Sequence, residues 1–341
     1  MGAGHTIRFK NAKPPRDIMI KGAIRAARGK ADTPIETQNA RGLPDLLTVN
    51  RIDALIGNTP LVKLNRITQG EGADVYIKME NVNPSGSIRD RYTREIVTHA
   101  VRAGYIVAGD SLAIAGIDDS AVAIALLTNL LNLNLKIFAP SNSSRRQVKL
   151  IERFGADIVW TAEEAGTCGA IEEAARWSRE ASDRIFVDGY RREAVNEAYR
   201  EMASEILDAL NGQVLAAFVT SVTTGGTLRH VAGKLRETHP DLQVGGAVLT
   251  DTEFPELSAY SYNRLTKIGL KKAWEMRDYI AREEGLLLSP KGAAAVHLAL
   301  KMRPDLPKDA VIVALNPDSG QRYLGWEDKP LFEVTFRPDI I

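Results

Sequence analysis

Residues 83–91 read Asn-Pro-Ser-Gly-Ser-Ile-Arg-Asp-Arg, and this stretch decides the fold. It follows a β-branched apolar run at 75–79, which predicts a strand. An amphipathic helix is predicted over 87–103, ending before Gly104. Parallel α/β sheets bind their ligands in loops that lead from a strand into a helix. The stretch therefore indicates both the class of fold and the place of a site.

The same alternation of short β-branched runs and longer segments of helical period continues through the chain. Further strands are predicted at 135–139, 158–161, 184–187, 215–220, 244–249 and 310–315, and further helices at 120–131 and 143–154. Strands separated by helices make right-handed crossovers, which give a parallel sheet covered on both faces. The sequence therefore predicts an α/β fold.

Length and composition narrow the class of protein. A chain of 341 residues exceeds the usual size of one hydrophobic core, so one large domain or two closely joined domains are expected. Lys and Arg number 44 against 43 Asp and Glu, a balance that argues against a nucleic-acid or membrane partner. The single cysteine, Cys168, excludes an internal disulfide. Without an apolar run long enough for a membrane span, a cytoplasmic location is expected.

The first 48 residues carry nine Lys or Arg and four acids, a local charge of +5. We predict a basic extension at 1–48 that packs on the body or on a partner subunit. A transit peptide is the alternative for such an Arg-rich start. The other predicted boundaries are an N-terminal α/β domain at 49–185, with part of its first segment packing on the other domain, a C-terminal α/β domain at 186–329 and a tail at 330–341.

Four motifs in chain order resemble the cysteine synthase and cystathionine β-synthase family. They are Ile-Gly-Asn-Thr-Pro-Leu-Val at 56–62, the stretch 83–91, Thr-Gly-Gly-Thr at 224–227 and Pro-Asp-Ser-Gly-Gln-Arg-Tyr at 317–323. The resemblance covers nearly the whole body of the chain. It implies the pyridoxal-phosphate (PLP) type II fold, with two α/β domains around a cofactor site, and usually a homodimer.

Position 89 departs from the family pattern. In the family, a Ser-Gly-Ser-x-Lys motif supplies the lysine that forms the Schiff base with PLP, and here that position is Arg89. A guanidinium stays protonated and cannot act as the neutral amine that a Schiff base needs. No lysine lies between Lys78 and Lys136 to replace it. We therefore expect no cofactor, and in particular no covalently bound PLP.

Two acids stand where the family grips the substrate carboxylate. The family motif Thr-Ser-Gly-Asn-Thr-Gly corresponds to Gly-Ile-Asp-Asp-Ser-Ala at 116–121. One acid, Asp118 or Asp119, can be an ordinary helix cap, but a cap explains only one of them. The other would repel a carboxylate, or would hold a proton if burial raised its pKa. In another stretch that resembles the family, Lys291 stands where the family has a small residue. The alternative is that Lys291 is an ordinary exposed lysine.

Glycines after the strand at 215–220 are typical of a phosphate cradle, because they let backbone N–H groups approach an anion. Ser319 matches the family serine that faces the pyridine nitrogen, and a simple turn is the alternative. The predicted catalytic residues are Arg89, Asp118, Asp119 and Lys291. The predicted anion-binding residues are Asn83, Ser87, Ser120, Thr224, Gly225, Gly226, Thr227 and Ser319. No metal site is predicted.

Three functions remain open. The favoured hypothesis is a cofactor-independent lyase, a decarboxylase acting on a small anionic acid such as the sulfonated unsaturated acid of bacterial coenzyme M biosynthesis. It rests on the charged side chains gathered where the family binds one anion. The first alternative is a non-catalytic partner or regulator of a cysteine synthase. The second is a PLP-dependent, cysteine synthase-like β-replacement enzyme. A homodimer is expected in each case.

Overall fold

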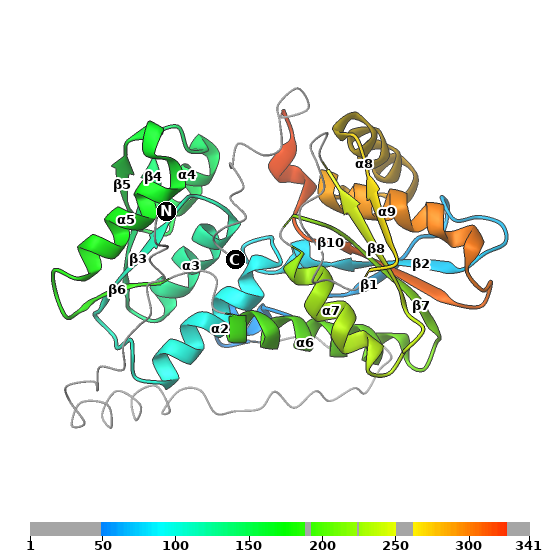
Figure 1. Ribbon diagram of the computed structural model, residues 1–341, viewed down its shortest axis with the longest axis horizontal. Helices are drawn as coiled ribbons and strands as arrows, with labels where there is room; N and C mark the ends of the chain where they lie inside the picture. Colours follow the sequence, from blue (N-terminus) through cyan, green and yellow to red (C-terminus); the bar gives the residue numbers. More distant parts are fainter. Residues whose placement is uncertain (1–48, 188–191, 224, 250–261, 326–341) are drawn as a thin grey trace, which may run out of the picture.

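The computed structural model describes residues 49–187, 192–223, 225–249 and 262–325. These residues form two sheets, each flanked by helices (Figure 1). One sheet has six strands in the order β1-β2-β10-β7-β8-β9, and the other has four in the order β5-β4-β3-β6. The predicted α/β fold is confirmed. The basic extension at 1–48 and the tail at 330–341 lie outside the described residues.

The six-stranded sheet joins the start of the described chain to its end. Its strands are β1 (Leu61–Lys63), β2 (Asp74–Met79), β7 (Leu215–Ser221), β8 (Gln243–Val248), β9 (Arg264–Lys267) and β10 (Val311–Asn316). All neighbours pair in parallel except β1 and β2. Helices α8 (Leu270–Glu284) and α9 (Pro290–Met302) cover one face, and α6 (Arg192–Leu210) and α7 (Gly226–Arg236) the other.

The four-stranded sheet is wholly parallel. Its strands are β3 (Ser111–Ala115), β4 (Asn134–Pro140), β5 (Asp157–Thr161) and β6 (Arg184–Phe186). Helix α5 (Gly166–Ser178) covers one face, and α2 (Arg89–Arg102), α3 (Asp119–Leu130) and α4 (Arg145–Arg153) pack on the other. Helix α3 is apolar on nearly every side because it is buried between the sheet and its helical neighbours.

Short 3₁₀ turns complete the described elements: η1 (Ile52–Leu55), η2 (Glu80–Val82), η3 (Glu163–Ala165), η4 (Arg303–Asp305) and η5 (Gly320–Tyr323). No helix within the described ranges is both long and apolar enough to cross a membrane. Strands β1, β3 and β9 were not predicted from the sequence.

One predicted helix start is corrected by the structure. We expected a helix from Ser87, but α2 begins at Arg89. Ser87 instead pairs with Asp318, and the N–H of Ile88 donates to the carbonyl of Pro317. The two residues before the helix are therefore tied to the loop that follows β10.

A buried ionic network, which we call the Arg91 network, anchors the stretch 83–91. Arg91 and Lys78 are both fully buried. Arg91 Nε lies 2.6 Å from Glu80 Oε2, and Arg91 Nη2 lies 2.7 Å from Glu205 Oε2. Lys78 Nζ lies 2.6 Å from the same Glu205 oxygen. The network therefore ties β2 and η2 to α2 and α6.

Glu205 is the shared anion of the Arg91 network. Burial acts to raise the pKa of Glu205, but the hydrogen bonds and charges of Arg91 and Lys78 outweigh it and lower the pKa to about 2. Because the folded-state pKa lies below the ordinary value of 4.5, this carboxylate stabilises the fold above about pH 5. The contribution is lost as the pH falls toward 2.

Replacing Glu205 with Gln should lower the free energy of unfolding by about 3 kcal/mol at pH 7, because two buried cations lose their shared anion. The difference from wild type should shrink at pH 3, where the wild-type carboxylate has lost part of its advantage. Urea unfolding at both pH values measures this. Glu237→Gln, in an exposed pair with Lys234, is the control and should change stability by less than about 0.5 kcal/mol. Equal stability of Glu205→Gln and wild type at pH 7 would contradict the role of the network.

Candidate active site

Loops that follow strands of the two sheets meet between them. Ser87, after β2, pairs with Asp318, after β10. Leu288, just before α9, pairs with Ser319. Asp119, after β3, forms an ion pair with Arg322. Because the carboxyl ends of parallel strands are where α/β folds bind ligands, this meeting point is the candidate active site.

Arg89 lies at the first position of α2, partly exposed. Its guanidinium carbon Cζ lies 5.4 Å from the ring centre of Tyr92, one helical turn further on. The backbone N–H of Arg89 donates to Ser87 Oγ at 3.2 Å. The structure therefore holds a cation over an aromatic face at the position where the family motif has its lysine.

Asp118 caps α3. One of its oxygens accepts from the N–H groups of Ser120 at 2.8 Å and Ala121 at 3.1 Å. Ser120 Oγ donates to the other oxygen at 3.1 Å and also contacts the hydroxyl of Tyr92. These N–H groups are the donors that a helix start offers to an anion. The Asp118 carboxylate therefore occupies the N–H groups at the start of α3, where the resemblance implies the substrate carboxylate, in agreement with the capping alternative.

Asp119 connects the four-stranded unit to the six-stranded one. It pairs with Arg322 Nη1 and accepts from Gln147 Nε2, the latter at 3.1 Å. Burial raises the pKa of Asp119, and the charge of Arg322 opposes that effect. Arg146 adds a second link by donating to the carbonyl of Gln321 at 2.8 Å. The arrangement makes Asp119 a bridging anion between the two units.

Lys291 lies beside the same loops, with its side chain 24% exposed. Its Nζ is 3.5 Å from Asp318 Oδ2, which also accepts from the hydroxyl of Tyr323 at 2.6 Å. Burial acts to raise the pKa of Asp318, but Lys291, Ser289 and Tyr323 together lower it. The structure thus places Lys291 in an ion pair with a buried acid rather than on an open surface.

The first turn of α7 provides the glycine cradle. Gly225 has a φ of 79°, a left-handed conformation that glycine adopts without strain, and Gly226 begins the helix. Thr227 Oγ1 donates to the hydroxyl of Tyr199 at 3.1 Å. Ser319 Oγ accepts from the N–H of Gln321 at 3.3 Å. Thr224 lies outside the described residues.

Asn83 is buried and holds its own loop. Its Nδ2 donates to the carbonyl oxygen and to Oε2 of Glu80, at 2.8 and 2.9 Å, and its Oδ1 accepts from the N–H of Gly57 at 2.9 Å. These contacts connect the loop to the Arg91 network. Anion binding by Asn83 and Ser87 stays a prediction.

Several site neighbours were not among the predicted residues. They are Tyr92, Tyr199, Asp318, Arg322 and Tyr323. Asp318, Arg322 and Tyr323 stand within the motif at 317–323, so the family resemblance carried a signal for them. Tyr92 and Tyr199 carried none, because an aromatic residue on a buried helix face is usually a core residue.

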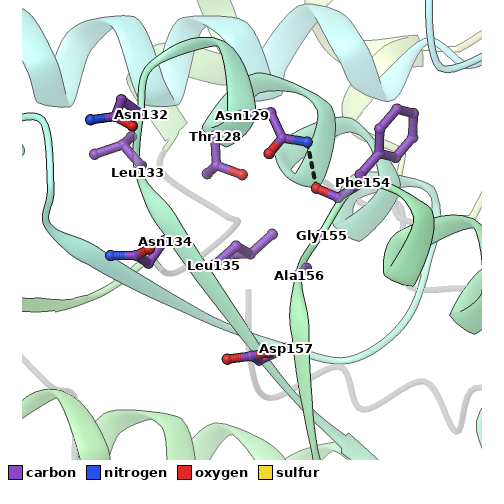
Figure 2. A pocket seen from close by; sticks show the side chains of 10 residues that line it. All are labelled: Thr128, Asn129, Asn132, Leu133, Asn134, Leu135, Phe154, Gly155, Ala156 and Asp157. Atoms are coloured by element: carbon purple, nitrogen blue, oxygen red, sulfur yellow. Dashed lines mark hydrogen bonds between the residues drawn. The ribbon is translucent and has the colours of Figure 1, made fainter.

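A polar pocket of about 240 Å³ lies elsewhere (Figure 2). Its lining includes Asn129 at the end of α3, Asn134 at the start of β4 and Asp157 at the start of β5. Figure 2 shows the Asn129 amide donating to the carbonyl of Phe154. The pocket is at the amino ends of the strands, away from the candidate active site.

Comparison with known proteins gives the family. Residues 52–254 match the family described as pyridoxal-phosphate dependent enzyme. The chain belongs to this family. A probable cysteine synthase of Bacillus subtilis is 30% identical over 79% of this chain and 94% of its own length.

Two solved structures extend the comparison. The crystal structure of O-ureido-L-serine synthase aligns with a TM-score of 0.75 and 25% identity, over 85% of this chain and 98% of that one. Cystathionine β-synthase from Bacillus anthracis aligns with a TM-score of 0.67 and 27% identity, over 80% of this chain and all of the other. The resemblance drawn from the motifs is confirmed.

One expectation is corrected by these comparisons. We predicted that the chain uses no cofactor, and this is wrong, because membership of a family of PLP-dependent enzymes points to PLP as the cofactor. The error came from treating one replaced residue, Arg89, as decisive for the whole cofactor site. The relatives of this chain within the family are named as enzymes, so an enzymatic role is also supported.

The described residues fit two parts of PLP. The left-handed Gly225 and the first turn of α7 fit the phosphate, because helix starts expose unpaired N–H groups. Ser319 lies on the loop that the family resemblance assigns to the pyridine ring. The guanidinium of Arg89 cannot be the amine that attaches the aldehyde. Covalent attachment therefore requires an amine at another position.

Replacing Asp118 with Ala should reopen the start of α3. We expect a loss of about 1 kcal/mol in unfolding free energy, because the helix cap is removed. The freed N–H groups of Ser120 and Ala121 should then bind sulfate, so added sulfate should raise the melting temperature of the variant more than that of wild type. Asp118→Asn keeps a capping oxygen and is the matched control. An identical sulfate response in Asp118→Ala and wild type would refute the interpretation that Asp118 occupies these N–H groups.

Proposed function

We propose that this chain is a PLP-family enzyme of the cysteine synthase type that removes or replaces the β-substituent of a small amino acid carrying a second anionic group. The observation that carries the proposal is the distribution of charge at the site, with an acid at the start of α3 and an arginine at the position of the family lysine. The Asp118 carboxylate occupies the N–H groups at the start of α3, and the cation Arg89 stands at the start of α2.

The distribution of charge determines which substrates suit the site. With Asp118 in place, an incoming carboxylate meets a negative charge rather than open N–H groups at α3. Arg89 supplies the compensating positive charge, and its planar guanidinium pairs well with carboxylate, phosphate or sulfonate groups. A substrate with an extra anionic group binds more tightly because of this arrangement, and a substrate without that group does not.

The other residues of the candidate active site have separate roles in binding the cofactor and in holding the site together. The first turn of α7 would hold the phosphate of PLP, with Ser319 on the loop assigned to its ring. PLP supplies an electron sink for bonds next to the substrate amine. Asp119 and Arg322 hold the two units together beside the reacting groups. Lys291 and Tyr323 orient Asp318 at the same place.

The comparisons favour a reaction on a serine-type amino acid. One similar protein is named probable cysteine synthase and another O-ureido-L-serine synthase. None of the compared proteins bears the name of a decarboxylase, so decarboxylation and a place in coenzyme M biosynthesis have no support from them. We retain one part of that hypothesis, namely that the substrate is a small anionic molecule, including a sulfonated one.

A second candidate is a non-catalytic partner of a cysteine synthase, and Arg89 is the observation that favours it. A homodimer is proposed from the family resemblance in either case. The two candidates differ in their response to small anions, because a partner protein has no need of a substrate site.

The first test uses a matched pair of unreactive acids, 3-sulfopropionate and propionate. We expect 3-sulfopropionate to raise the melting temperature of the wild-type protein by several degrees and propionate to have little effect. Arg89→Ala should abolish the difference between the two acids. Arg153→Ala, which removes an exposed cation at the end of α4, should leave it unchanged. An equal response of wild type to both acids would exclude an Arg89 anion site.

The second test locates the cofactor. The purified protein, incubated with PLP, should retain it through gel filtration, and excess inorganic phosphate should displace it from the start of α7. In Arg89→Lys, borohydride reduction should fix PLP to residue 89, as mass spectrometry of the peptides would show. In wild type the label should be absent from residue 89, because a guanidinium does not react. Failure of both proteins to retain PLP would count against this cofactor site.

A further inference from the structure

Tyr92 is the residue on which the guanidinium of Arg89 rests. We infer that Tyr92 is a positioning residue, which orients Arg89 toward the second anionic group of the substrate. The inference rests on the proposed function, because it assigns a role in binding the same anion. It adds a residue that no family motif marks.

The first support is the placement of the two side chains. Arg89 and Tyr92 are three residues apart on α2, so they lie on one face of the helix. The Cζ atom of Arg89 is 5.4 Å from the ring centre of Tyr92, within the range of a cation–π contact. Tyr92 itself is only 5% exposed. A buried ring therefore gives a long, flexible cation a fixed surface.

The second support is the hydrogen-bond chain that fixes the ring. Ser120 Oγ has one proton, which it donates to Asp118 Oδ2 at 3.1 Å. In the contact between Tyr92 and Ser120, Tyr92 is therefore the donor. Burial raises the pKa of Tyr92, so the phenol keeps the proton it donates. The chain from Tyr92 through Ser120 to Asp118 ties α2 to the start of α3.

The third support is the neighbourhood of α7. Tyr199 lies close enough to Tyr92 to influence its pKa, and its hydroxyl accepts from Thr227 in the first turn of α7. Tyr199 therefore connects the surroundings of Tyr92 to the first turn of α7.

This arrangement also explains why position 89 suits an arginine. In general, a planar guanidinium can stack on an aromatic face and also pair with a planar or tetrahedral anion through its N–H groups. An ammonium at the end of a lysine makes a less directional contact. Tyr92 and Arg89 are therefore expected to act as a pair.

The test compares Tyr92→Phe and Tyr92→Leu by calorimetric titration of the full chain with 3-sulfopropionate and with propionate. Tyr92→Leu removes the ring and should weaken 3-sulfopropionate binding about tenfold, while propionate binding changes less than twofold. Tyr92→Phe keeps the ring and should stay within about threefold of wild type for both acids. In the Arg89→Ala background, Tyr92→Leu should have no further effect on 3-sulfopropionate binding.

The outcomes separate this inference from the proposed function. If wild type does not prefer 3-sulfopropionate to propionate, the proposed anionic substrate fails and the inference fails with it. If wild type shows the preference and Tyr92→Leu keeps it, only the positioning role is overturned. Equal weakening of both acids, or additive effects of Tyr92→Leu and Arg89→Ala, would indicate a merely structural role and also overturn it.

Discussion

The Arg91 network is the constraint on which the candidate site depends. Two fully buried cations, Arg91 and Lys78, require carboxylates at contact distance, because an unpaired buried charge costs several kcal/mol. Glu80 and Glu205 come from η2 and α6, so the requirement brings β2, α2 and α6 to one place. The stretch 83–91 is thereby held at both ends, by Asn83 bound to Glu80 and by Arg91. Arg89 stands at the start of α2, two residues before Arg91, so the network anchors the backbone next to it.

A second consequence concerns how charge is distributed over the site. Asp118 places a carboxylate on the free N–H groups at the start of α3, and Asp119 is compensated by Arg322. Asp318 is compensated by Lys291. Each added acid is thus matched by a base or by helix donors, as buried or half-buried charges must be. The charges gathered in the sequence form a set of pairs that links the two units, and Arg89 lies near them at the start of α2.

The sequence was sufficient for the fold because the strands of parallel sheets are continuous apolar runs, as in β4, β7 and β10. It missed β3 and β9, since three of the five residues of Ser111–Ala115 are small and three of the four residues of Arg264–Lys267 are polar. The partners of the site charges were not predictable. Asp119 and Arg322 are 203 residues apart, and no local pattern joins them. The sequence left open whether Asp118 or Asp119 caps α3. The structure shows that it is Asp118, whose side chain accepts from the N–H groups of Ser120 and Ala121.

The cofactor shows where inference from one residue fails. A PLP site is made of separate parts that bind phosphate, ring and aldehyde, and a replacement at one part does not remove the others. Here Gly225 and Ser319 stand at the positions that the resemblance assigns to the phosphate and the ring, while position 89 has a guanidinium where the family has an amine. Residue 89 therefore cannot attach the aldehyde, and we propose that it binds an anion instead. Tyr92 lies against this guanidinium and Asp118 occupies the N–H groups at the start of α3, and these two contacts are the structural support for the proposed anion site.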